Sequence, residues 1–240
     1  MASRPVFIPI SEYPFVREET VEFQWYPGFS KAQAQKSIRS LHRAAREAGI
    51  DPVLEISSKS TLSMGVELSA FNLMVTFENG SRMSVECAFQ GSKVFEFGGP
   101  YQDIYQASSI EAKKDERLRT SGNVVGFQLF DEEFPTEPKT AFYDWLYLKG
   151  LSQNPVYAKM LEKFEGFSDI HFNPEKSINC QARAAALFVA LERKGVIEEI
   201  LEDRTAYFSI ISDSNKDKQE EKFVEKQDQL SFNFGNNENG

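Results

Sequence analysis

Residues 68–97, LSAFNLMVTFENGSRMSVECAFQGSKVFEF, contain the pattern that decides the fold. Apolar and polar residues alternate over residues 73–78, which predicts an extended strand with one buried face. Asn79 and Gly80 follow this strand, and both residues tolerate the positive φ of a tight turn. We therefore expect a β-hairpin, in which the chain returns through a second short strand.

After the hairpin the period of the sequence changes. Glu86, Gln90 and Lys93 are spaced i, i+4 and i+7, so a helix would carry a carboxylate, a carboxamide and an amine on one face. Such a stripe is typical of a solvent-exposed helix face. A helix that leaves directly from a hairpin would instead place the stripe at the end of a sheet, where clefts form. We expect this helix to end at residues 98–100, GGP.

The composition indicates a globular protein, since 41% of the residues are hydrophobic and 13% are aromatic. No apolar run approaches the roughly 20 residues that span a bilayer, and residues 1–14 lack the basic and apolar parts of a signal peptide. A cytoplasmic protein without membrane contact is therefore expected. Cys87 and Cys180 are expected to be buried thiols, and no metal-binding motif is present.

The net charge of −9 is unevenly distributed along the chain. Residues 196–240 have a net charge of −6, which leaves −3 for the first 195 residues. A helix capped by Ser30 and ended by Gly49 is distinctly basic. Its apolar face is predicted to comprise Ala34, Ile38, Leu41, Ala45 and Ala48. Its basic side chains are Lys31, Lys36, Arg39, Arg43 and Arg46. This basic face is either a solvated surface or a contact for a phosphate backbone.

Later segments predict a strand over residues 123–130 and three further helices. The first of these helices covers residues 140–150 and is rich in aromatic residues, which suits a place in the core. The second runs from Pro155 to Gly166, and the third covers residues 177–194. Before them, a cationic segment can either meet a pyrophosphate or form a solvated helix; its basic residues are Lys113, Lys114, Arg117 and Arg119.

Five short segments form a further pattern. They are residues 56–60 (ISSKS), 68–73 (LSAFNL), 88–96 (AFQGSKVFE), 137–148 (EPKTAFYDWLYL) and 176–183 (KSINCQAR). In this order they resemble the signatures of the NADAR family, also called the YbiA-like N-glycosidases. The resemblance is greater to the NADAR antitoxins that accompany DarT-type DNA ADP-ribosyltransferase toxins. It implies an α+β fold, with a single domain that is mostly helical around a small sheet.

The resemblance also implies a reaction, the cleavage of an N-glycosidic bond at C1 of a ribose. In the toxin-linked members the substrate is ADP-ribosylated guanine in DNA, so it implies a hydrolase that acts as an antitoxin and repairs the DNA. Two alternatives stay open. One is an N-glycosidase for ribosylated pyrimidines of a riboflavin-type pathway, and the other is a non-catalytic module that binds ADP-ribose. No cofactor is expected, and a DarT-type toxin is a possible partner.

Such a bond breaks through an oxocarbenium-like or ring-opened sugar, which requires a proton donor for the leaving nitrogen and a group that meets the developing cation. Glu86 is the first candidate for both roles. A lysine with some free amine can instead attack C1 to form a Schiff base, and Lys59 and Lys93 are both candidates. Gln90 would orient Glu86 or a ribose hydroxyl.

Substrate binding is assigned to a wider set of residues, mostly on the family motifs. The set comprises Ser69, Phe71, Asn72, Phe89, Gln90, Asp144, Trp145, Asn179 and Arg183. Tyr143 and Trp145 offer rings on which a base can stack. The position of a second acid stays open between Asp144 and Asp169.

The resemblance and the composition together divide the chain into three regions. Residues 1–22 are expected to be extended, with an edge strand at about residues 6–10. Residues 23–211 would form the catalytic domain, and residues 212–240 a disordered acidic tail. In this tail, Gln229 to Phe234 resembles the hexapeptide by which bacterial DNA-processing proteins bind the sliding clamp. A terminal strand that packs back on the domain is the alternative.

Overall fold

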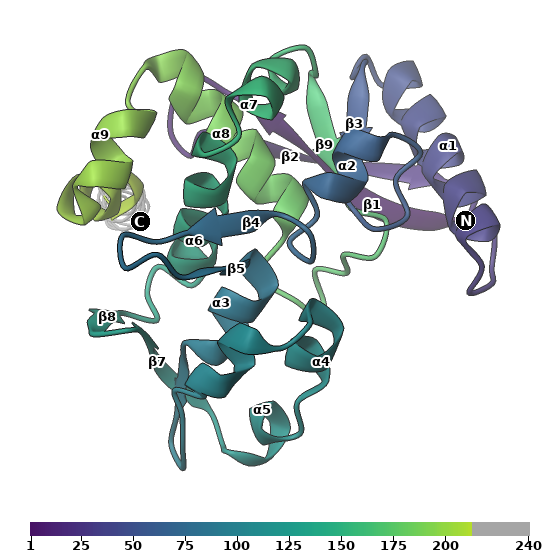
Figure 1. The fold of residues 1–240 in the computed structure, drawn as a ribbon. Coiled ribbons are helices and arrows are strands. Elements are labelled where there is room, and N and C mark those ends of the chain that lie inside the picture. The colour runs from purple at the N-terminus through teal and green to yellow at the C-terminus, as the bar shows by residue number, and fades with distance from the viewer. Residues whose placement is uncertain (213–240) are drawn as a thin grey trace, which may run out of the picture.

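The computed structural model describes residues 1–212 of the chain. Within these residues it is an α+β structure, as expected, in which helices surround three small sheets. Figure 1 shows the four-stranded sheet near α1 at the right of the view and the two smaller sheets to its left and below. The predicted clamp-binding segment, Gln229 to Phe234, lies outside the described residues.

The four-stranded sheet is mixed and has the order β2-β1-β9-β3. β1 (Ala2–Pro9) pairs antiparallel with β2 (Val16–Phe23) and with β9 (Gly166–Ser168). β9 pairs in parallel with β3 (Val53–Glu55). The expected edge strand at residues 6–10 is therefore wrong, because β9 covers that side of β1. A strand of three residues is too short to show a period of its own.

Helices cover both faces of this sheet. Val6 and Ile8 of β1 pack in one hydrophobic cluster with α1 (Lys31–Glu47), whereas Phe7 points to a second cluster that contains residues of α8 (Gln181–Lys194). Alternate residues of a strand point to opposite faces, so β1 connects the two clusters.

The basic helix forms as predicted. Ser30 caps α1 by accepting a hydrogen bond from the backbone N–H of Gln33. The apolar face is buried from Ala34 to Ala45, but Ala48 is exposed, because it is the residue at which the helix ends. The short α2 (Ser63–Glu67) follows β3.

The hairpin is also confirmed. β4 (Met74–Thr76) pairs antiparallel with β5 (Arg82–Ser84), and Gly80 has a φ of 81° in the turn. The central helix, α3 (Val85–Gly91), begins directly after β5. Its predicted end at residues 98–100 is wrong.

The helix ends at Gly91, where a Cβ would lie 2.5 Å from the ring of Tyr105. Beyond it, Lys93 begins β6 (Lys93–Phe95), which pairs with β7 rather than continuing the helix. β6, β7 and β8 form the three-stranded sheet, with short helices beside it. The elements of this region are β7 (Val124–Leu129), β8 (Glu132–Phe134), the 3-10 helix η1 (Gln102–Gln106), α4 (Ser109–Lys114) and α5 (Arg117–Thr120).

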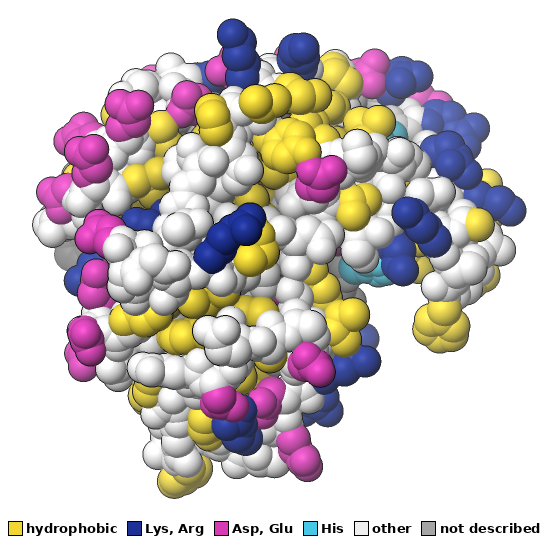
Figure 2. Space-filling view, viewed as in Figure 1, with side chains coloured by type: hydrophobic (Ala, Val, Ile, Leu, Met, Phe, Trp, Pro, Cys, Tyr) yellow, Lys and Arg dark blue, Asp and Glu magenta, His cyan; other side chains and the backbone are white. Residues whose placement is uncertain are grey.

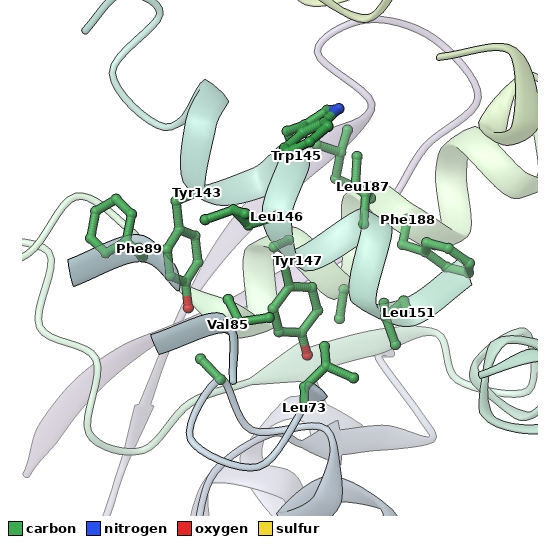
Figure 3. Close-up of a cluster of buried hydrophobic side chains, with 14 of the residues drawn as sticks. Leu73, Val85, Phe89, Tyr143, Trp145, Leu146, Tyr147, Leu151, Leu187 and Phe188 are labelled. Atoms are coloured by element: carbon green, nitrogen blue, oxygen red, sulfur yellow. The ribbon is translucent and has the colours of Figure 1, made fainter. Parts of the chain in front are cut away.

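The aromatic helix α6 (Ala141–Ser152) is buried along almost its whole length. Figure 3 shows Tyr143 and Tyr147 on one side of α6 and Trp145 on another. The Tyr147 hydroxyl donates a hydrogen bond of 2.7 Å to the carbonyl oxygen of Leu68. Since the helix turns about 100° per residue, positions 143 and 147 share a face that position 145 cannot join.

The last elements of the described chain are helical except for β9. α7 (Pro155–Leu161) ends before the predicted Gly166, because Gly166 is the first residue of β9. α8 begins at Gln181 rather than at residue 177, and α9 (Ile197–Glu202) follows it. Residues 204–212 are helical as well. No helix within residues 1–212 is both long and apolar enough to cross a membrane.

Candidate active site

A pocket of about 400 Å³ opens between α3, α4 and the segments that follow β3 and β9. Seven of the predicted site residues line it: Ser69, Phe71, Glu86, Phe89, Gln90, Lys93 and Asn179. The hairpin positions Glu86, Phe89 and Gln90, because β5 leads directly into α3 and turns this side of the helix toward the segments that follow β3 and β9. The predicted stripe is thus the wall of a pocket and not a solvated face.

Glu86 and Gln90 form a hydrogen-bonded pair on this wall. Gln90 Nε2 donates to Glu86 Oε1 at 2.9 Å, and the two residues are only 5% and 9% exposed. The amide oxygen of Gln90 is buried and accepts no hydrogen bond within the described residues. The side-chain amide oxygen of Asn179 is likewise buried without a donor there. Buried acceptors of this kind are normally hydrogen-bonded. They therefore suit a ligand that carries hydroxyl or amino groups.

Lys93 reaches the same pocket from β6 rather than from the helix. Its Nζ lies 4.6 Å from the centre of the Phe89 ring, a cation–π contact. Burial lowers the pKa of the Lys93 amine to about 8, although the Glu86 carboxylate opposes this effect and the charge of Lys113 adds to it. At pH 7, one unit below this pKa, about a tenth of the amine is uncharged. Part of the Lys93 amine is therefore in the uncharged form that a nucleophilic attack would need.

Asp169 and His171 line the pocket from the segment after β9. Asp169 accepts hydrogen bonds from Gln181 Nε2 and from the backbone N–H of His171, both at 2.9 Å. Burial nevertheless raises the pKa of Asp169, so the carboxyl keeps its proton to a higher pH than usual. Asp169 is thus the candidate second acid that the structure brings to the pocket.

Glu55 lies behind this wall, at the end of β3. Its carboxyl accepts from Ser57 Oγ at 2.7 Å, from Ser168 Oγ at 2.6 Å and from the backbone N–H of Ile170 at 2.9 Å. Burial and the charge of Asp169 raise the pKa of Glu55 to about 8, against these hydrogen bonds. Glu55 therefore ties the loop after β3 to the segment that carries Asp169.

Lys59 does not line the pocket, although its neighbours Ser57 and Ser58 do. It is half-buried on the loop between β3 and α2. Partial burial lowers the pKa of His171 against the opposing charge of Asp169, and the charge of Lys59 lowers it further. Lys59 is thus close to the rim of the pocket.

Four predicted binding residues lie elsewhere. Asn72 is exposed, and its amide donates to the carbonyl oxygen of Val66. Trp145 packs against Phe134 on the far side of α6. The buried Asp144 and the half-buried Arg183 form an ion pair of 2.6 Å between α6 and α8. Burial raises the pKa of Asp144, and the Arg183 guanidinium opposes that shift.

Among the four cations proposed for a pyrophosphate, Lys113 lines the pocket. Its Nζ lies 5.1 Å from the centre of the Phe71 ring. Arg117 is held instead by Asp103 and Asp115, each at 2.7 Å. The described residues contain no group of three or more His, Cys, Asp or Glu side chains that could hold a metal ion.

His171, Gln181 and Glu55 were not assigned to the site from the sequence. Glu55 has a visible signal, since it is the one charged residue in the apolar segment PVLEI at residues 52–56. The sequence gives no such signal for His171, because this residue reaches the pocket only through the pairing of β9 with β1 and β3.

Comparison with known proteins places the chain in a defined group. A family model described as DarT1-associated NADAR antitoxin matches residues 2–221. No curated protein matches the chain. The match covers the hairpin, α3 and every residue of the pocket.

Proposed function

The chain belongs to the family of DarT1-associated NADAR antitoxins, and from this premise we propose that it removes ADP-ribose from guanine bases in DNA. The family assignment supports an antitoxin role, a NADAR-type glycosidase fold and a DarT toxin as the partner system. The proposal adds the substrate, ADP-ribosylated guanine in DNA, and the reaction, hydrolysis of the N-glycosidic bond.

A single observation carries this proposal: Glu86, Gln90 and Lys93 meet in one largely buried pocket. A carboxylate held by an amide donor can stabilise the positive charge that develops at a ribose C1, and an amine with a pKa of about 8 can attack that carbon.

One route uses two acids. As the bond between C1 and the guanine nitrogen breaks, the Glu86 carboxylate stabilises the positive charge on the sugar. Asp169, whose pKa is raised, gives its proton to the leaving nitrogen. Water then adds to C1 and returns a proton to Asp169, which releases ADP-ribose and unmodified guanine.

A second route uses a lysine. The uncharged amine of Lys93 or Lys59 attacks C1 of the ring-opened sugar, and the guanine leaves after it receives a proton. Water hydrolyses the resulting imine, which frees the lysine and ADP-ribose. Burial and the lowered pKa favour Lys93, whereas Lys59 remains a candidate because it lies beside the rim of the pocket.

The rest of the pocket suits an ADP-ribosyl group. Lys113 supplies an exposed positive charge for the pyrophosphate. Phe71 and Tyr143 offer aromatic surface. The unpaired oxygens of Gln90 and Asn179 can accept from ribose hydroxyls.

The test is mass spectrometry of single-stranded DNA that carries ADP-ribosylated guanine, after incubation with the wild type, Glu86→Gln, Lys59→Ala or Lys93→Ala. Parallel reactions contain borohydride, which reduces an imine to a stable adduct. Glu162→Gln and Lys159→Ala are matched controls, because both residues are exposed on α7 or at its end, away from the pocket.

Release of ADP-ribose by the wild type and the controls, but not by Glu86→Gln, supports the proposal. A trapped adduct that is lost in only one lysine variant identifies the nucleophile. If Glu86→Gln releases ADP-ribose as fast as the wild type, the result contradicts the role of Glu86. Cleavage of a ribosylated pyrimidine in place of modified DNA would favour the riboflavin-type alternative, and binding of ADP-ribose without turnover would favour the binding module.

A further inference from the structure

The exposed face of α1 has a strong positive charge. Lys36, Arg39, Arg43 and Arg46 are spaced so that they project from one side of the helix, and all four are exposed. No acidic residue occurs between residues 31 and 46. Among the described residues, Arg46 alone of these four has a carboxylate partner, Asp51 at 3.1 Å. The other three charges are therefore available to a ligand.

These side chains line a hollow of about 720 Å³, which we call the basic groove. Its lining residues are Tyr26, Lys36, Ile38, Arg39, His42, Arg43, Arg46 and Thr61. Figure 2 shows Lys and Arg side chains gathered over α1 at the right of the view, whereas Asp and Glu side chains gather over α9 at the left. The surface charge is thus segregated, although the chain as a whole is acidic.

The basic groove and the candidate active site share a wall, the loop over residues 57–61. Ser57 and Ser58 line the active-site pocket, and Thr61 lines the basic groove. Lys59 lies between them. α1 is fixed to this loop, because Gln35 Nε2 donates to the carbonyl oxygen of Ser60 at 3.3 Å. A ligand that occupies the basic groove therefore lies one loop away from Glu86 and Lys93.

A second contact connects α1 to β9 and to the buried Glu55. His42 Nε2 lies 3.0 Å from Ser168 Oγ, which donates to the buried carboxyl of Glu55. Burial lowers the pKa of His42 to about 4, although the charge of Asp51 opposes this shift and Arg46 adds to it. His42 is consequently neutral and serves as a link between α1 and β9.

Two aromatic residues precede α1 in the chain. Phe29 is fully exposed just before α1, and Tyr26 lines the groove itself. An exposed aromatic ring beside a row of cations is the arrangement on which unpaired bases stack while the backbone meets the charges. Duplex bases offer no such free face, and a base inside a duplex must leave the stack before an enzyme can act on it.

We propose that the basic groove binds the phosphate backbone of single-stranded DNA next to the modified guanine, and that this contact delivers the base across the 57–61 loop. Charge complementarity supports this assignment, and the identity of the polyanion rests on the proposed function. It makes α1 a docking surface that is separate from the groups that break the bond.

The test compares a triple variant, Lys36→Ala, Arg39→Ala and Arg43→Ala, with the wild type. The matched control, Lys139→Ala, Lys159→Ala and Lys163→Ala, removes three exposed charges that line neither the pocket nor the basic groove. Fluorescence anisotropy measures binding of unmodified single-stranded DNA over a range of salt concentrations. Hydrolysis is measured on modified DNA and on the ADP-ribosylated guanine mononucleotide.

The triple variant should bind the oligonucleotide about tenfold more weakly at low salt. The slope of log affinity against log salt should fall by about 2, at roughly 0.7 for each lost phosphate contact. The kcat/KM for modified DNA should fall in parallel, whereas turnover of the mononucleotide should not change. The control variant should match the wild type throughout.

Equal DNA binding by the triple variant and the wild type would overturn the proposal, as would an equal loss in the control or tighter binding of duplex than of single-stranded DNA. The anisotropy experiment needs no turnover. If neither substrate is hydrolysed by the wild type, the proposed function fails, but the salt dependence of binding still decides the role of the basic groove.

Discussion

Replacement of Lys93 by methionine should stabilise the protein at neutral pH. The folded protein holds a charged amine at pH 7 in a site that lowers its pKa from 10.5 to about 8. At about 1.4 kcal/mol per pH unit, this difference sets an upper limit of about 3 kcal/mol on the cost of burying the charge. Methionine has a similar length and carries no charge, so Lys93→Met removes that cost.

The dependence on pH follows from the same shift. Below pH 8 the amine is charged in both the folded and the unfolded protein, so the full cost opposes folding. Between pH 8 and 10.5 the folded protein loses the proton first, and the wild type gains stability as the pH rises. The advantage of Lys93→Met should therefore be largest at pH 7 and should disappear near pH 10.5.

Urea unfolding at several pH values between 7 and 10.5 measures this effect directly. Lys159→Met is the control, because Lys159 is exposed on α7 and its replacement should change the free energy of unfolding by less than about 0.5 kcal/mol. A variant that is less stable than the wild type at pH 7 would refute the reasoning. An advantage of equal size at pH 7 and pH 10.5 would refute it as well, since that result would reflect packing rather than charge.

Three further predictions concern groups around the pocket. Because the pKa of Glu55 is raised to about 8, the wild type should lose stability as the pH rises from about 4.5 to 8, and Glu55→Gln should flatten that loss in urea unfolding. Arg183→Leu leaves the Asp144 carboxylate buried without its partner and should lower the free energy of unfolding by up to about 3 kcal/mol. ADP-ribose release per folded molecule should change little, and a loss of more than tenfold would contradict the placement of this pair outside the pocket. Gly91→Ala should destabilise the protein by about 1–3 kcal/mol in thermal unfolding, because its Cβ would meet the Tyr105 ring; an unchanged melting temperature would contradict that packing.

Local pattern was sufficient for several turns, caps and helix faces, although not for the ends of α3 and α7 or the start of α8. The turn at Asn79 and Gly80, the cap at Ser30 and the buried face of α1 were all predicted from residues within a few positions of one another. The same holds for the meeting of Glu86 with Gln90, which one turn of helix brings together. The segment resemblance led to the same family that the family model identifies.

Long-range pairing decided the remaining parts of the fold. β1 is an interior strand because β9, distant in sequence, pairs with it. The same pairing carries Asp169 and His171 to the pocket. A strand of three residues has too few positions to display a period, so its existence depends on the partners that complete its hydrogen bonds.

The sequence by itself determined the family, the hairpin, the amphipathic helices and the pair of Glu86 and Gln90. Only the tertiary structure decided which lysine lines the pocket, which of the two candidate acids lies there, and that Trp145 faces away. The reason is that a helix or a hairpin is set by contacts between near neighbours, whereas the pocket is closed by segments from β3, α3, β6 and β9. Their approach depends on how the whole core packs.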